Sequence, residues 1–156
     1  MITATVKQLK DELKVKDKEE LLFLCLTLAK FKKETKELLT YLLFESSDEM
    51  GFISGVKAEI TEDFMEVNTS SIYYVKKSAR KILRNTKKYI RYSKNKQTEV
   101  ELLIHYCREL IQVSPSVMRS VTMKNLYQRQ LDQIKKSIKN LHEDLQHDYA
   151  LELEQL

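Results

Sequence analysis

Glycine, proline and tryptophan are the residues that this sequence has least of: two Gly, one Pro and no Trp among 156 residues. Tight hairpins, β-sandwiches and open α/β sheets depend on Gly and Pro at their turns. Their scarcity argues against those folds and predicts an all-α protein. A chain of this length buries roughly 70% of the surface that its unfolded form exposes, so it needs no covalent or metal staple.

Long apolar runs are also missing. The longest run, Leu21 to Phe31, reads LLFLCLTLAKF and has 11 residues, whereas a membrane-spanning helix needs about 20. We therefore predict that Leu21–Phe31 is the central core helix and the most buried segment of a soluble protein. The N-terminus, MITATVKQLKDEL, lacks the basic and apolar regions of a signal peptide, so we expect a cytoplasmic location.

The residues that build catalytic and metal sites are few. The two cysteines, Cys25 and Cys107, lie in separate apolar runs without metal-ligand spacing, so we expect both to be buried, reduced thiols. Glu101 and His105 are four residues apart, but two ligands are too few for a zinc site. The sequence contains no Gly-rich phosphate loop. We predict a protein that is not an enzyme, with no catalytic, cofactor-binding or metal-binding residues.

Charge is distributed unevenly along the chain. Residues 1–66 hold 10 Lys and 14 acids, residues 67–98 hold ten Lys and Arg and no acid, and residues 99–156 hold 7 bases and 9 acids. At helical spacing, the apolar residues from Ile72 to Ile90 gather on one face of the basic stretch. The opposite face carries the candidate contacts for an anion or a nucleic acid: Lys76, Lys77, Arg80, Lys81, Arg84, Lys87, Lys88 and Arg91.

We expect a single domain, residues 1–156, made of stacked antiparallel helical hairpins that form a short α-solenoid or an irregular helical bundle. Its parts are an acidic helical half (1–66), a basic helix with a hairpin (67–113) and a long C-terminal helix (114–156). Capping boxes, in which two side chains satisfy the first amides of a helix, are expected at Asp17/Glu20, Ser46/Glu49 and Thr98/Glu101. Helices at about 17–31 and 34–44 should form an antiparallel hairpin, and Ser114-Pro115 should start the last helix.

The last helix carries a heptad-like seam. Tyr127, Leu131, Ile134, Ile138, Leu141 and Leu145 alternate spacings of four and three residues. A homodimer through residues 127–145 is one interpretation. The flanking positions, among them Gln130 and Ser137, lack the opposed charges of a zipper, so we favour a helix that packs on its own domain.

Two stretches allow a comparison with a known family. LKDELKVKDKEELLFLCLTLAKFKKETKELLTYLL and the later VKKSARKILRNTKKYIRYSKNKQTEVELLIHYCREL resemble an uncharacterised bacterial family of small helical proteins. In that family an L-x-x-L helix and a K-E-E-L hairpin precede a basic helix and a second hairpin. The resemblance extends to about Val113. It implies an all-helical fold and a cytoplasmic location, and it transfers no site residue.

Two functional hypotheses follow from these patterns. The first is a non-enzymatic helical interaction or scaffold module whose partner is another protein, since helical stacks commonly bind proteins along a groove. The alternative is a nucleic-acid-binding protein that uses the basic helix, residues 72–92, on the phosphate backbone without base specificity. Tyr73, Tyr74 and Tyr92 lie in or beside the basic arc, where they could stack on bases. A third possibility is that the protein's own acidic helices neutralise the cations.

Overall fold

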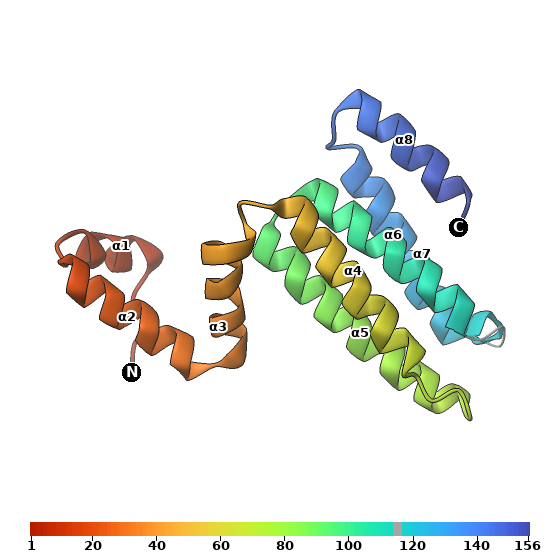
Figure 1. Ribbon diagram of the computed structural model, residues 1–156, viewed down its shortest axis with the longest axis horizontal. Helices are drawn as coiled ribbons and strands as arrows, with labels where there is room; N and C mark the ends of the chain where they lie inside the picture. Colours follow the sequence, from red (N-terminus) through yellow and green to blue (C-terminus); the bar gives the residue numbers. More distant parts are fainter. Residues whose placement is uncertain (114–116) are drawn as a thin grey trace. The chain divides into compact units, whose positions relative to one another are not determined.

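The computed structural model describes residues 1–113 and 117–156, and within these ranges all regular elements are helical. The expected all-α class is confirmed. None of the described helices combines the length and the apolar character that crossing a bilayer requires. In chain order (Figure 1) the elements are α1 (Val6–Lys14), α2 (Lys18–Phe31), α3 (Lys33–Thr40), the π-helical turn η1 (Tyr41–Glu45), α4 (Glu49–Met65), α5 (Ile72–Ser93), α6 (Lys96–Val113), the 3-10 turn η2 (Val117–Arg119), α7 (Val121–Ile138) and α8 (Glu143–Glu154).

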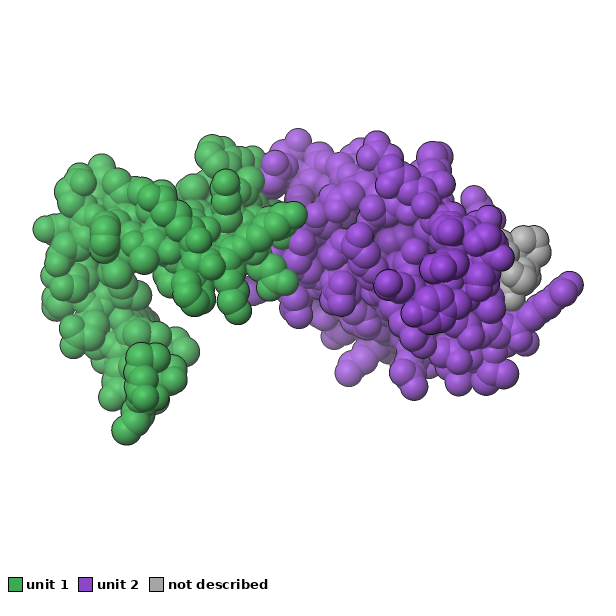
Figure 2. Space-filling view, turned by 90° about the horizontal axis from the view of Figure 1, so that it is seen from below, with its two compact units in different colours: residues 1–44 green, residues 45–156 purple. Residues whose placement is uncertain are grey.

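The chain forms two compact units, unit 1 with residues 1–44 and unit 2 with residues 45–156 (Figure 2). This division differs from the single domain with internal borders near residues 66 and 113 that the charge pattern suggested. The acidic helix α4 belongs with the basic helix α5 in unit 2, because its apolar side chains are buried there: Phe52, Ile53, Val56, Ile60 and Phe64.

Helix α6 is the core helix of unit 2. Figure 1 shows α4, α5, α6 and α7 running alternately in opposite directions, and α6 contacts each of the other three. Its apolar and aromatic side chains that are at most 1% exposed are Val100, Leu102, Leu103, Ile104, Tyr106, Cys107 and Leu110.

The prediction that Leu21–Phe31 is the most buried segment is wrong. No residue of α2 is buried, and Leu24 and Leu28 are 36% and 59% exposed. Cys25 is exposed too, whereas Cys107 is buried as expected. A helix that is apolar on all sides needs a partner surface, but its sequence does not say whether that partner lies in the same chain.

Unit 1 contains three helices, of which α2 and α3 contact each other. The predicted capping box at Asp17 and Glu20 is confirmed, and a second one, at Thr5 and Gln8, starts α1. Figure 1 shows the chain turning back after α2, with α3 splayed from α2 at an open angle, so the expected antiparallel hairpin forms only in part, and the two helices contact each other. Most of α2 is therefore left uncovered.

The other two expected capping boxes do not form. Asp48, and not Ser46, caps α4 by accepting a hydrogen bond from the Gly51 amide (3.0 Å). Thr98 lies inside α6, is buried, and donates its hydroxyl hydrogen bond to Glu49. Its side chain serves a contact between helices, which local spacing could not reveal.

The expected single C-terminal helix is also wrong, because α7 ends at Ile138 and α8 begins at Glu143. The Asn140 side chain donates to the Lys136 carbonyl (2.9 Å), and such bonds compete with continued helix. Three seam residues, Tyr127, Ile134 and Ile138, are buried within unit 2. The proposed cap at Ser114-Pro115 falls outside the described residues.

Candidate nucleic-acid interface

Helix α5 displays the basic stretch, and local capping fixes both of its ends. The Ser71 hydroxyl accepts a hydrogen bond from the Tyr73 amide (3.2 Å) at the start. At the other end Lys94 adopts the left-handed conformation (φ 57°), and its amide donates to the Ile90 carbonyl (2.9 Å). The observed helix, residues 72–93, closely matches the predicted basic helix.

One face of α5 is anchored in the core of unit 2. Val75, Ala79, Ile82, Leu83 and Thr86 are buried, as the helical spacing predicts. The Tyr106 hydroxyl of α6 donates to the Ala79 carbonyl of α5 (3.0 Å). This packing fixes the rotation of α5 about its axis, so the opposite face must point to solvent.

The candidate cations lie on that opposite face. Lys77, Arg80, Lys81, Arg84 and Arg91 are exposed, and Lys76, Lys87 and Lys88 are partly buried. Lys88 lies over the Tyr89 ring, 4.8 Å from its centroid. The other seven form no salt bridge with any residue that the structure describes. Salt bridges in unit 2 instead join other groups, such as Arg108 and Glu152 (2.8 Å).

Two tyrosines flank these cations at the start of α5. Tyr73 and Tyr74 are 64% and 47% exposed, and their rings meet edge to face with centroids 5.5 Å apart. They line a shallow depression of about 730 Å³ together with five of the candidate cations and one acid, Glu66. Those five are Lys76, Lys77, Arg80, Lys81 and Arg84.

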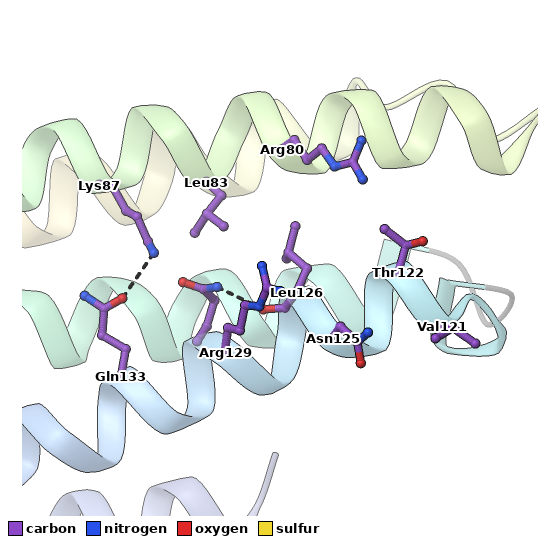
Figure 3. A pocket seen from close by; sticks show the side chains of 10 residues that line it. Arg80, Leu83, Lys87, Val121, Thr122, Asn125, Leu126, Arg129 and Gln133 are labelled. Carbon is purple, nitrogen blue, oxygen red and sulfur yellow. Dashed lines mark hydrogen bonds between the residues drawn. The ribbon is translucent and has the colours of Figure 1, made fainter.

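A second hollow, of about 600 Å³, separates α5 from α7 (Figure 3). Arg80 lines both hollows, so the basic surface is continuous from one to the other. In Figure 3, Lys87 reaches from α5 toward Gln133, and Arg129 reaches from α7 toward α5. Among the described residues that line this groove, three are cations and none is acidic.

A buried carboxylate holds one of these cations in place. Lys87 donates to the Gln133 side-chain carbonyl (3.1 Å), and the Gln133 amide group donates to Glu99 (2.6 Å). Glu99 also accepts hydrogen bonds from Lys96 (2.7 Å) and Ser137 (2.9 Å). Burial alone would raise the pKa of Glu99, but these hydrogen bonds outweigh it and lower the pKa. The ionised Glu99 therefore orients Gln133, which in turn positions Lys87.

Burial disfavours the charged form of Lys87 as it does that of Glu99, but for an amine this lowers the pKa. Its partial desolvation lowers the pKa, and the nearby Glu99 carboxylate acts against that shift. An ammonium group that has already lost part of its water shell needs to give up less hydration when an anion binds. Lys87 therefore lines the groove with its ammonium group partly desolvated and hydrogen-bonded to Gln133.

Gln130 forms part of the groove wall, and only one of the two polar groups of its side chain has a hydrogen-bond partner in the described structure. Its side chain is 2% exposed, and its amide nitrogen donates to the Leu126 carbonyl (2.9 Å). Its side-chain oxygen has no hydrogen-bond partner in the described structure. Such a buried acceptor lowers stability.

Sequence reasoning missed the contribution of α7. Arg129, Asn125 and Thr122 line the groove, and none was a candidate. A signal was present, because residues 110–131 contain Arg119, Lys124 and Arg129 and no acid. This second acid-free stretch was overlooked because its charge density is far lower than that of residues 67–98.

The remaining ionisable groups of α6 serve packing. Glu101 pairs with Lys57 of α4 and accepts a hydrogen bond from Tyr149 of α8. His105 shares a hydrogen bond with Thr61 (2.8 Å), and burial lowers its pKa. Over residues 1–113 and 117–156, no group of three or more potential ligands could hold a metal ion.

No protein-family model, no curated protein and no solved structure matches this chain. The resemblance of residues up to about 113 to an uncharacterised bacterial family therefore stays a prediction. Any functional conclusion must come from the residues of the chain itself.

Proposed function

We propose that the chain is a non-enzymatic binding protein that holds single-stranded nucleic acid by its phosphates along the basic surface of α5 and α7. The observation that carries this proposal is the pairing state of the cations: seven of the eight candidate residues on α5 form no salt bridge with the described residues. Unpaired, closely spaced cations on a rigid helix attract a polyanion and gain from the release of its counterions.

The tyrosines favour a single strand over a duplex. Proteins that bind single strands combine a basic groove with aromatic rings on which bases stack. Tyr73 and Tyr74 provide exposed rings in the same depression as Lys77, Arg80 and Arg84. A base-paired duplex hides the faces of its bases and could not use these rings. Every base has such a face, so binding without sequence preference is expected.

Fluorescence anisotropy with a labelled oligothymidylate and a labelled duplex of equal length would test the proposal. We expect tighter binding of the single strand. With about five phosphate contacts, log affinity should fall with log salt at a slope of roughly −3.5. Arg80→Glu combined with Arg84→Glu should weaken binding by roughly tenfold or more, because each lost contact is worth about 1 kcal/mol.

The matched control is Lys7→Glu combined with Lys10→Glu in α1, which changes the net charge of +4 by the same amount. This pair should leave the affinity nearly unchanged. An equal loss of affinity in both double variants would show that the effect comes from net charge alone. No binding at tens of micromolar protein in low salt would overturn the proposal.

An interaction module is the second candidate function, and a different observation favours it. Ten large apolar side chains between Val6 and Phe31 are exposed in unit 1. Extended apolar surfaces of this kind mark protein interaction sites. Unit 1 would then bind a protein, independently of the basic surface of unit 2.

A further inference from the structure

We propose that the groove between α5 and α7 is a pocket for one base of a bound single strand, and that the Gln130 side-chain oxygen accepts a hydrogen bond from an N–H group of that base. This inference rests on the proposed nucleic-acid binding and adds a base contact to the contacts with phosphates. It concerns residues of unit 2 alone.

Gln130 carries the observation that points to a ligand. Its side chain is 2% exposed, and its amide nitrogen donates to the Leu126 carbonyl (2.9 Å), whereas its oxygen has no partner among the described residues. Most buried polar atoms in folded proteins are paired, because an unpaired one has lost its hydrogen bonds to water without replacement. A position that served packing alone would favour an apolar residue. The free acceptor therefore points to a donor that a ligand supplies.

The groove is the side from which such a donor approaches Gln130. Gln130 lines it together with Leu83 of α5 and Leu126 of α7, and these two leucines point into the space between the helices in Figure 3. The volume of about 600 Å³ lies in the range of roughly 300–1,000 Å³ that is typical of ligand sites. The Gln130 oxygen is closed to water in the unbound protein, so an entering base has to shift neighbouring side chains to reach it.

The lining of the groove matches the parts of a nucleotide. Leu83 and Leu126 offer an apolar surface to a flat ring. Arg80, Lys87 and Arg129 attract phosphate, and no acid is found among the described residues that line the groove. A single strand leaves the Watson–Crick edges of its bases open to hydrogen bonding. One nucleotide therefore supplies the ring, the anion and the donor for which the groove has contacts.

Arg80 connects this pocket to the tyrosines. It lines both the groove and the depression that contains Tyr73 and Tyr74. One strand can therefore stack a base on a tyrosine, place a phosphate at Arg80 and insert another base into the groove. A small anion without a ring would use Arg80 and leave Gln130 unpaired.

The test uses N3-methylthymine, which keeps the ring and the charge of the strand and removes the N–H donor. Fluorescence anisotropy of the full chain would compare a labelled oligothymidylate with a strand of equal length in which every base is N3-methylthymine. We expect the wild-type chain to bind the methylated strand roughly threefold to tenfold more weakly, which is the effect of losing one hydrogen bond. An abasic strand of equal length should bind more weakly still, because it also lacks the rings.

Gln130→Leu removes the acceptor and keeps a buried side chain of similar size. This variant should bind the two strands with equal affinity, close to that of the wild type for the methylated strand. Gln128→Leu is the matched control, because it makes the same change at an exposed position of α7 outside the groove. The control should keep the full difference between the strands. Near-UV spectra would confirm that both variants are folded.

The outcomes separate this inference from the proposed function. Equal binding of the two strands by the wild type would overturn the base pocket, and so would a difference that persists in Gln130→Leu. Phosphate binding would survive either result, as long as oligothymidylate binds and the Arg80/Arg84 charge reversal weakens it. No binding of oligothymidylate would overturn both. Should Gln130→Leu not fold, the comparison of the two strands on the wild type still decides.

Discussion

Glu99 and Gln130 are two buried polar side chains of unit 2 whose environments differ sharply. Glu99 is 6% exposed and accepts hydrogen bonds from Lys96, Gln133 and Ser137. Gln130 leaves its side-chain oxygen without a partner in the described structure. A buried carboxylate is tolerated when hydrogen bonds to its charged form replace the lost water. Glu99 meets this condition and should therefore stabilise the fold.

Replacing Glu99 tests this role and its dependence on pH. At neutral pH, Glu99→Gln should lower the free energy of unfolding by about 1–3 kcal/mol, because it removes charge-assisted hydrogen bonds. The pKa of Glu99 is lowered in the folded state, so its stabilisation is present above the pKa of the unfolded chain, near 4.3, and is lost as pH falls through the lower folded value. Urea unfolding at pH 7 and below pH 4 would measure the two differences.

Glu12→Gln, an exposed change of the same kind in α1, is the control for that experiment. It should have little effect at either pH. A difference between wild type and Glu99→Gln that stays constant from pH 7 to pH 3 would show that the ionised carboxylate is not the stabilising form.

At the scale of single helices, sequence patterns predicted α5 well and α2 poorly. The apolar face of α5 alternates with its cations, so its buried residues could be named from spacing alone. Helix α2 is apolar on all sides, and its composition indicates only that it needs partners. Helix α6, the observed core helix, carries Glu99, Glu101, His105 and Arg108 and looked less apolar. Its charged residues are satisfied by neighbouring helices, and such long-range pairing leaves no local signal.

Two leucine substitutions distinguish the core helix from the exposed one. Leu103→Ala in α6 should lower the free energy of unfolding by about 2–5 kcal/mol, because the side chain is fully buried. Leu28→Ala in α2 should have less than about 1 kcal/mol of effect on the thermal transition of unit 2, since Leu28 lies outside its core. A larger loss of stability for Leu28→Ala than for Leu103→Ala in denaturation experiments would show that α2, and not α6, is the core helix.

The part of the candidate site on α5 could be predicted from the sequence, and the part on α7 could not. The candidate cations of α5 do share one exposed side, because helical periodicity fixes that arrangement. Arg129 and the groove wall of α7 depend on how α7 packs against α5 and α6, which single-sequence periodicity does not determine. The hydrogen-bonded chain from Glu99 through Gln133 to Lys87 links three helices, and periodicity could not predict it for the same reason.

For the whole molecule, the division into two units separates two kinds of surface. Unit 2 contains the buried core, centred on α6, together with the cationic groove. Unit 1 contains the exposed apolar residues of α1 and α2, and no residue of α1, α2 or α3 is buried. A segment of about 40 residues without a core rarely folds alone. Unit 1 should therefore need a partner surface to stay folded, whereas unit 2 should not.

A fragment of residues 45–156 tests this division directly. Because the core of unit 2 lies within that range, the fragment should fold by itself, with a single cooperative thermal transition and the near-UV spectrum of packed tyrosines. It should keep the affinity for oligothymidylate shown by the full chain, because the basic surface of α5 and α7 lies within unit 2. Failure to fold would mean that residues 1–44 complete its core. A dimeric fragment would show that unit 2 carries a self-association surface of its own.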